Sequence, residues 1–151
     1  MSGVAATKAV TERLRTIVPN AKVWDTLDST TDPKAFAERF TRDKVIHCYE
    51  VTREGSTPVE TESVQQIKRR EGVTIYGYYS FQQNVSEAIF QAEIDAICAA
   101  FDPPRLRRFP EEYGIEWSLA PTVEGPRIGR LSQYIVHFAR IIIPVEFDPI
   151  C

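Results

Sequence analysis

Residues 73–101, VTIYGYYSFQQNVSEAIFQAEIDAICAAF, contain the two elements that decide the fold. Between residues 73 and 81 two sets of side chains alternate, as they do in a strand whose two faces meet different surroundings. In residues 86–101 the apolar side chains recur at helical spacing, and Asp102-Pro103-Pro104 ends the pattern. The stretch therefore predicts a strand, a short connection and a long helix.

The predicted helix carries two separate apolar faces. A projection at 100° per residue gathers one bulky stripe and one face of smaller side chains. The bulky stripe is Phe90, Ile94, Ile97 and Phe101, and the second face is Val85, Ala88, Ile89, Ala92, Ala96 and Ala99. We expect both faces to be covered within the chain, by the sheet and by the first helix, and keep another subunit as the alternative. We expect Asn84 or Ser86 to cap the helix.

The remaining elements are predicted outward from this pair by the same periodicities and by Gly and Pro signals. The expected elements are a helix at 4–18, a strand at 21–27, a short helix from Pro33 to Phe40, strands at 45–52, 63–81 and 113–119 with a bend at Glu71-Gly72, a turn-rich stretch at 121–129 and a last strand at 133–147. Both faces of the last strand are apolar, which predicts that it is central or covered on both sides.

These elements predict a single α+β domain over residues 1–151. We expect a mixed, mostly antiparallel sheet, packed by the N-terminal helix and the longer central helix. The polar stretch 53–62 is expected to form an extended hairpin or flap, and the polar half of the following strand, 64–70, to project from the core. Net charge −3 argues against a general binder of phosphate backbones.

No apolar run is long enough to cross a bilayer, and the first residues do not form the pattern of a signal peptide. Three widely spaced cysteines, Cys48, Cys98 and Cys151, fit reduced thiols in a cytosol. We therefore expect neither a membrane anchor nor a disulfide framework.

Few residues have the spacing that catalysis or metal binding requires. His47 and His137 are the only histidines, so we expect no metal, no cofactor and no catalytic residue. His137 is expected to be a hydrogen-bonded core or interface histidine, and Cys48 and Cys98 to be packed thiols rather than nucleophiles. The stretch 124–130, EGPRIGR, does not end in the Gly-Lys-Ser/Thr of a phosphate loop and is predicted to be a hairpin connection.

Five segments together resemble one family. They are IVPN with AKVW at 17–24, VIHCYEVTRE at 45–54, IKRREGVTIYGYY at 67–79, SEAIFQAEIDAICAAF at 86–101 and YIVHFARIIIPVE at 134–146. In this order they resemble the tail terminator, or tail-completion, proteins of long-tailed bacteriophages, over most of the chain.

The resemblance implies a structural virion protein and not an enzyme. Such proteins form a ring, usually of six subunits, that caps the tail tube, stops its polymerisation and joins the tail to the head connector. The implied partners are further copies of the chain, the tail-tube protein and a head-completion or connector protein, while DNA passes through the lumen without specific binding. The implied location is the head-proximal end of the virion tail, after assembly in the host cytoplasm.

Charge and expected exposure, rather than a family motif, select the candidate contact residues. Candidates for contacts between subunits or with the tube are Arg53, Glu54, Glu60, Glu62, Gln65, Lys68, Arg69 and Arg70, and a second basic cluster is Arg105, Arg107 and Arg108.

Three alternatives stay open. A neck or head-closure subunit would share the small α+β architecture but attach on the portal side. A small-ligand-binding protein or enzyme would need a pocket between the long helix and the sheet, near Cys48 or His137. A nucleic-acid-binding module would use the basic arm and lose affinity steeply with salt.

Overall fold

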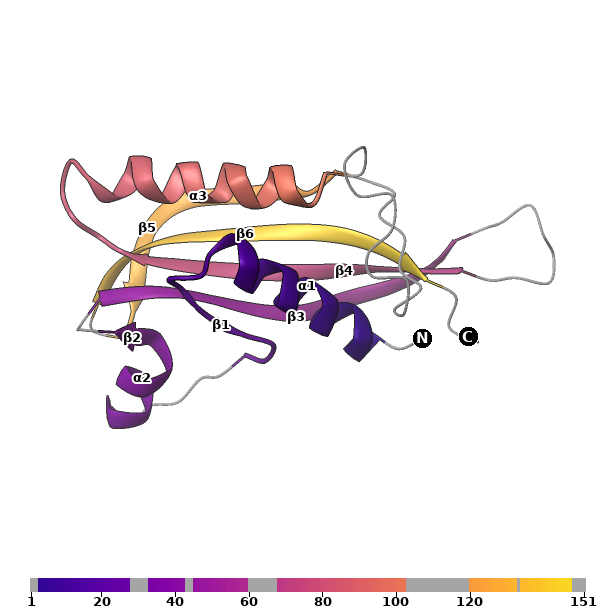
Figure 1. Ribbon diagram of the computed structural model, residues 1–151, viewed down its shortest axis with the longest axis horizontal. Coiled ribbons are helices and arrows are strands. Elements are labelled where there is room, and N and C mark those ends of the chain that lie inside the picture. Colours follow the sequence, from indigo (N-terminus) through magenta and orange to yellow (C-terminus); the bar gives the residue numbers. More distant parts are fainter. Residues whose placement is uncertain are drawn as a thin grey trace.

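The computed structural model describes residues 3–27, 33–42, 45–59, 68–102, 120–132 and 134–147. These residues form a six-stranded sheet and three helices, an α+β fold as the sequence predicts (Figure 1). In chain order the elements are α1 (Gly3–Ile17), β1 (Lys22–Trp24), α2 (Pro33–Phe40), β2 (Thr41–Arg42), β3 (Val45–Val59), β4 (Lys68–Ser80), α3 (Ser86–Ala100), β5 (Thr122–Leu131) and β6 (Tyr134–Phe147).

The sheet is mixed and mostly antiparallel. Its strand order is β1-β3-β4-β6-β5, with β2 paired to the start of β3. Only the pair of β1 with β3 is parallel; the other described pairs are antiparallel. β4 is paired with β3 on one side and with β6 on the other over nearly its whole length. The last strand, β6, lies between β4 and β5, so its predicted position inside the sheet is confirmed.

Helices α1 and α3 cover the same face of the sheet and touch each other (Figure 1). They enclose the main hydrophobic core because each turns an apolar stripe towards alternate residues of the strands. The helices contribute Ala6, Ala9, Val10, Leu14, Phe90, Ile94, Ile97 and Phe101, and the sheet contributes Tyr49, Val51, Val73, Ile75, Ala139, Ile141, Ile143 and Val145.

Gly77 lets the largest of these side chains lie flat on β4. Gly77 is directly opposite Tyr49, whose ring is fully buried. A Cβ atom at Gly77 would lie 2.8 Å from Cε1 of Tyr49 and 3.3 Å from Cζ of Phe90. The Tyr49 hydroxyl donates a hydrogen bond to Glu93 of α3, so the ring is held at both ends. A side chain at position 77 would therefore have to displace the contact between α3 and the sheet.

The opposite face of the sheet has a smaller core under α2. Phe36 and Phe40 of this helix pack on Ile46, Cys48 and Val136, as their spacing of four predicts. The adjacent residues His47 and Cys48 thus point to opposite faces, since His47 contacts Glu93 of α3. Most of this face beyond α2 carries polar and aromatic side chains.

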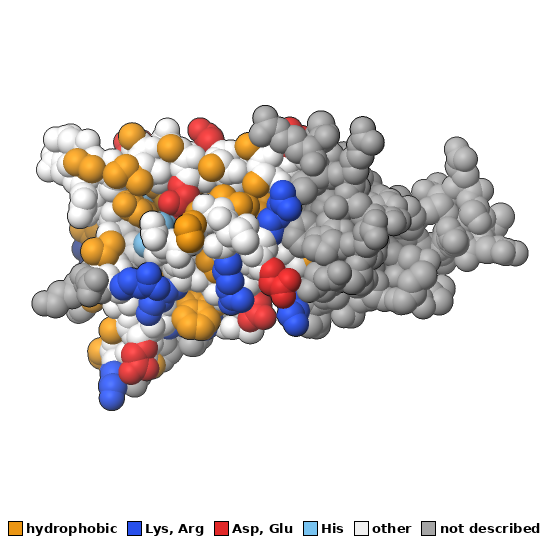
Figure 2. Space-filling view, in the orientation of Figure 1, with side chains coloured by type: hydrophobic (Ala, Val, Ile, Leu, Met, Phe, Trp, Pro, Cys, Tyr) orange, Lys and Arg blue, Asp and Glu red, His pale blue; other side chains and the backbone are white. Residues whose placement is uncertain are grey.

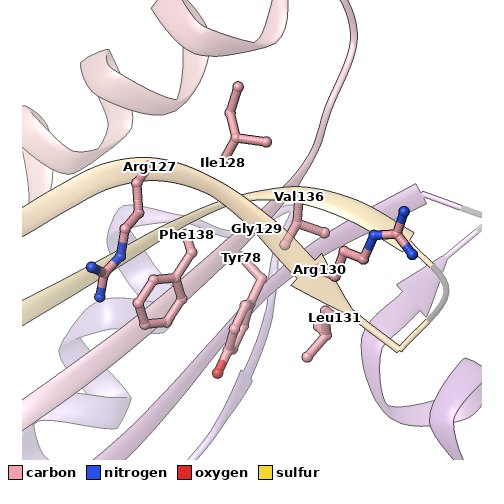
Figure 3. Close-up of a pocket in the computed structure, with 8 residues that line it drawn as sticks. All are labelled: Tyr78, Arg127, Ile128, Gly129, Arg130, Leu131, Val136 and Phe138. Carbon is pink, nitrogen blue, oxygen red and sulfur yellow. The ribbon is translucent and has the colours of Figure 1, made fainter.

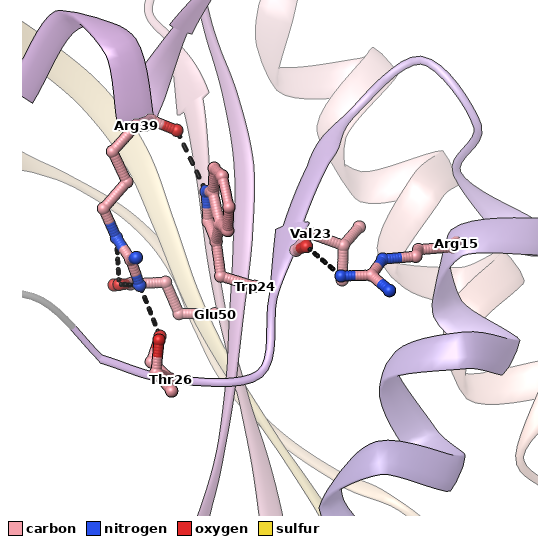
Figure 4. Close-up of polar contacts among 6 residues, drawn as sticks. All are labelled: Arg15, Val23, Trp24, Thr26, Arg39 and Glu50. Atoms are coloured by element: carbon pink, nitrogen blue, oxygen red, sulfur yellow. Dashed lines mark hydrogen bonds and ion pairs between the residues drawn. The ribbon is translucent and has the colours of Figure 1, made fainter.

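A buried ion pair fixes α2 and β1 to the sheet (Figure 4). Arg39 of α2 contacts Oε2 of Glu50 at 2.7 Å, and the Glu50 side chain is 3% exposed. The carbonyl of Arg39 accepts a hydrogen bond from Nε1 of Trp24 at 3.0 Å, and its guanidinium lies 5.0 Å from the Trp24 ring centroid. Arg39 therefore joins three elements that are far apart along the chain.

Three local predictions were wrong. The residue at the cap of α3 is Val85, whose apolar side chain makes no capping hydrogen bond. Asn84 precedes the cap with φ +68°, and the Ser86 hydroxyl donates to the carbonyl of Gln82. The stretch 121–129, including the expected hairpin connection at 124–130, lies almost wholly in strand β5. Its Gly-Pro turn signal instead marks a register shift between Glu124 and Arg127, where Gly125 has φ +98°.

The bend expected at Glu71-Gly72 lies on the neighbouring strand. The irregularity falls between Glu54 and Ser56 of β3, opposite Gly72 and Glu71. Gly72 permits the close approach, because a Cβ there would lie 3.1 Å from the carbonyl oxygen of Glu54. The strand predicted at 113–119 lies outside the described residues.

The expectation that both apolar faces of α3 are covered within the chain was also wrong. The bulky stripe is buried, but Val85 and Ile89 are 51% and 45% exposed. Ala88, Ala92 and Ala96 are exposed as well. Helix α1 packs on the sheet beside α3 and does not cover this second face.

Gly77→Ala should lower the free energy of unfolding by about 1–3 kcal/mol, because the added methyl overpacks the site between Tyr49 and Phe90. Urea denaturation followed by circular dichroism measures the change. Gly129→Ala in β5 is the matched control, since a Cβ there meets nothing within 4 Å. Equal stability of the two variants would contradict the account.

Glu50→Ala should lower the free energy of unfolding by about 3 kcal/mol or more, because it leaves the Arg39 guanidinium without its buried partner. The same denaturation experiment applies. Glu124→Ala removes a carboxylate that is 54% exposed and pairs with Arg140, so its effect should stay within about 1 kcal/mol. A larger loss of stability in Glu124→Ala than in Glu50→Ala would show that the Arg39–Glu50 pair does not hold α2.

Candidate interaction surfaces

The contact residues predicted from charge fall into two groups. Arg53 and Glu54 lie in β3, and Lys68, Arg69 and Arg70 begin β4. The expected flap at 53–62 is thus strand as far as Val59, which pairs with Lys68. Arg69 and Arg70 also pair with β6, so this part of the expected arm belongs to the sheet. Glu60, Glu62, Gln65, Arg105, Arg107 and Arg108 lie outside the described residues.

Glu54 belongs to a polar network that crosses four strands. On the sheet face opposite α1 and α3, its carboxylate accepts a hydrogen bond from the hydroxyl of Tyr76 on β4. It also pairs with Arg140 on β6, and Arg140 pairs with Glu124 on β5 at 2.9 Å. Successive strands place these side chains on one face, because directly opposed residues of a sheet point the same way.

The network changes the acidity of its members. The hydrogen bond from Tyr76, together with Arg140, holds the pKa of Glu54 below its ordinary value of 4.5. Partial burial and then the Glu54 carboxylate raise the pKa of Tyr76. Glu54 is therefore a carboxylate held ionised within the sheet, and it links strands in addition to any contact it makes with a partner.

A hollow of about 330 Å³ lies beside this network at β5. Tyr78, Phe138 and Arg127 line it on one side of the strands, while Ile128 points to the other side (Figure 3). The guanidinium of Arg127 lies 5.4 Å from the Phe138 ring centroid. The hollow therefore lies on the α2 side of the sheet, and not between the long helix and the sheet, where the ligand-binding alternative would need its pocket.

The groups with reactive chemistry are engaged in packing. His137 is 3% exposed and its Nε2 lies 2.6 Å from Oγ of Ser86, which confirms the hydrogen-bonded core histidine. Burial raises the pKa of Cys48 to about 12, so the buried thiol is a poor nucleophile. Cys48 and His137 lie on opposite faces of the sheet and cannot form a nucleophile and base together. Across the described segments, no three His, Cys, Asp or Glu side chains cluster as metal ligands would.

Exposed apolar side chains gather in two groups, one on α3 and one around β5. One group is the face of α3 that the first helix leaves open, visible as hydrophobic side chains along the upper edge of Figure 2. The other is on β5 and the adjoining strand ends, where Ile128 is 61% and Ile135 is 50% exposed. The sequence showed the first group as a helical face, but no pattern indicated the second, because β5 was predicted to be a turn.

The comparisons with known proteins leave the family open. A scan against protein-family models finds no match to this chain, and a search of curated proteins finds no significant relative. The functional argument therefore rests on the residues and surfaces described above. None of the helices in the described ranges is long and apolar enough to cross a membrane.

The stability that Glu54 contributes should depend on pH. Because its pKa is lowered by folding, the contribution is present above the unfolded-state pKa, about 4.3, and is lost as the pH falls through the folded-state value. Thermal unfolding of the wild type and Glu54→Gln should differ at neutral pH; the difference should shrink as the pH falls below the ordinary Glu value and disappear only below the folded-state pKa of Glu54. A difference that is unchanged in acid would show that Glu54 is not held ionised by Tyr76 and Arg140.

Proposed function

We propose that this protein is a structural subunit of the virion of a long-tailed bacteriophage and acts as its tail terminator. Copies of the chain form a ring, with six subunits as the expected number, that caps the tail tube and stops its polymerisation. The ring presents its other side to a head-completion or connector protein. DNA passes through the lumen without specific binding, and the chain performs no catalysis.

The observation that carries the proposal is the exposure of apolar side chains in two groups, one on α3 and one around β5. Large exposed apolar groups next to a well-formed core are characteristic of surfaces that bind other proteins. A subunit of a ring needs two such surfaces, because each copy contacts two neighbours. The five sequence segments that resemble tail terminators cover α3 and most of β3, β4 and β6, which build this core together with α1.

The charged residues at one end of the sheet are proposed as contacts with the tube or with neighbouring subunits. Arg53 is exposed, and Lys68, Arg69 and Arg70 lie across from the end of β3, close to one another along the sheet. The basic residues at this end of the sheet would suit an acidic surface on a partner. The candidates at 60–65 and 105–108 extend the same proposal.

Electron microscopy of the purified chain, alone and mixed with the tail-tube protein encoded beside it, tests the function. We expect closed rings that bind one end of each tube, together with tubes that stop growing when the chain is added. A chain that binds the portal-side proteins and leaves tube growth unchanged would favour the neck or head-closure alternative. A folded chain that forms no ring and caps no tube would contradict the proposal.

The hollow at β5 provides a test of the alternative that the chain is a small-ligand-binding protein or enzyme. Its volume of about 330 Å³ is at the lower end of the range of small-molecule sites. If the chain were a ligand-binding protein or enzyme, substitution of Phe138 by Ala would abolish that activity. Under the tail-terminator proposal, the same variant should retain tube capping once it is shown to be folded.

A further inference from the structure

The first exposed apolar group lies on the side of α3 that points away from the sheet. Phe90, Ile94 and Ile97 are buried against the sheet. At 100° per residue, the exposed Ile89 is turned away from this buried stripe. With Val85, Ala88, Ala92 and Ala96 it forms what we term the outer face of α3.

The second group lies past β6, on the strand at the edge of the sheet. Ile128 is directly opposite His137, and Val123 is directly opposite Ile141, in the register of β5 with β6. Because His137 and Ile141 are buried towards the helices, Ile128 and Val123 point to the same face of the sheet. We term this group the β5 surface; it consists of Phe81, Val123, Ile128, Arg130 and Ile135.

The two surfaces are apolar in the same way but opposite in charge. The span of α3 contains no Lys or Arg; its exposed acids are Glu87 and Asp95, while Glu93 is bonded to His47 and Tyr49 within the molecule. The β5 surface carries the exposed Arg130, while the one carboxylate of β5, Glu124, is paired with Arg140 on the other face of the sheet. One chain thus carries both halves of a complementary pair, an acidic apolar helix and a basic apolar strand.

Both halves stay exposed in the folded chain, so they do not cover each other within one molecule. They can meet between two molecules. We propose that the outer face of α3 in one copy of this chain docks on the β5 surface of the next copy. The contact is head-to-tail, so each copy keeps one surface of each kind free for a further neighbour, and repetition closes into a ring when the rotation allows it.

The inference deepens the proposed function and rests on it for the ring, but its contact can be tested separately. Ile89 and Ile128 are the large side chains at the two surfaces, with 45% and 61% of their area exposed. Large apolar anchors of this kind dominate binding energy at protein interfaces. A charged residue at either position should therefore weaken the contact without entering the core.

The experiment uses the full chain and the variants Ile89→Asp and Ile128→Asp. Their masses in solution are measured by light scattering after gel filtration, and circular dichroism verifies that they are folded. The wild type should assemble, and each variant alone should be a monomer, with its association weakened about tenfold or more. Leu27→Asp is the matched control; Leu27 is 52% exposed and lies outside both surfaces, so this variant should assemble like the wild type.

A mixture of the two variants tests the head-to-tail arrangement. Ile89→Asp keeps an intact β5 surface and Ile128→Asp keeps an intact outer face, so the 1:1 mixture should form a heterodimer that grows no further. A contact that pairs the same surface of both copies would leave at least one variant able to assemble by itself, or the mixture monomeric, and would overturn the proposal.

The other outcomes are also decisive. Folded variants that assemble like the wild type would show that these surfaces do not join the copies. A wild-type chain that stays monomeric alone and on tail tubes would assign the surfaces to a different protein and overturn the claim of a second copy. If the variants behave as expected but the wild type caps no tube, the contact stands and the tail-terminator function fails.

Discussion

Helix α3 has two apolar faces, and only one of them meets the sheet. The bulky stripe from Phe90 to Phe101 closes the main core over Tyr49 and the neighbouring strands. This packing leaves Ile89 and the small residues beside it in water. Because exposed apolar area favours association, the same helix that completes the fold also provides a surface for assembly.

The two faces of the sheet have different chemistry because of this arrangement. The face under α1 and α3 is filled by aliphatic and aromatic side chains, and Gly77 is small so that the Tyr49 ring can lie between the layers. On the opposite face, among the described residues, α2 covers one end, and polar and aromatic side chains line the rest of the strands. Glu54, Tyr76 and Arg140 link neighbouring strands there, while the Arg39–Glu50 pair holds α2 in place.

The sequence predicts the elements whose periodicity is strong and leaves out those defined by contacts across the chain. α3 and β6 follow from their apolar spacing, and β6 has the central position that its two apolar faces indicate. β5 escapes prediction because Gly125 and Pro126 read as a turn and its side chains are exposed on both faces. The parallel pairing of β1 with β3 joins segments that local patterns do not relate.

The candidate interaction surfaces were likewise predicted only in part from the sequence. Charge and expected exposure selected Arg53, Glu54 and the 68–70 cluster, but they did not show that Glu54 is bound to Tyr76 and Arg140. Helical spacing identified the second apolar face of α3, yet spacing cannot say which of two apolar faces is covered. The β5 surface depends on the register of β5 with β6, which places Ile128 opposite His137, and is visible only in three dimensions.

The central claim is that copies of this chain bury the outer face of α3 against the β5 surface. Carbene footprinting read by mass spectrometry measures this burial residue by residue, in the dilute monomer and in the assembled protein. The account predicts that labelling at Ile89 and Ile128 falls together on assembly, while labelling at Leu27 does not change. Assembly that leaves Ile89 and Ile128 fully labelled would contradict it.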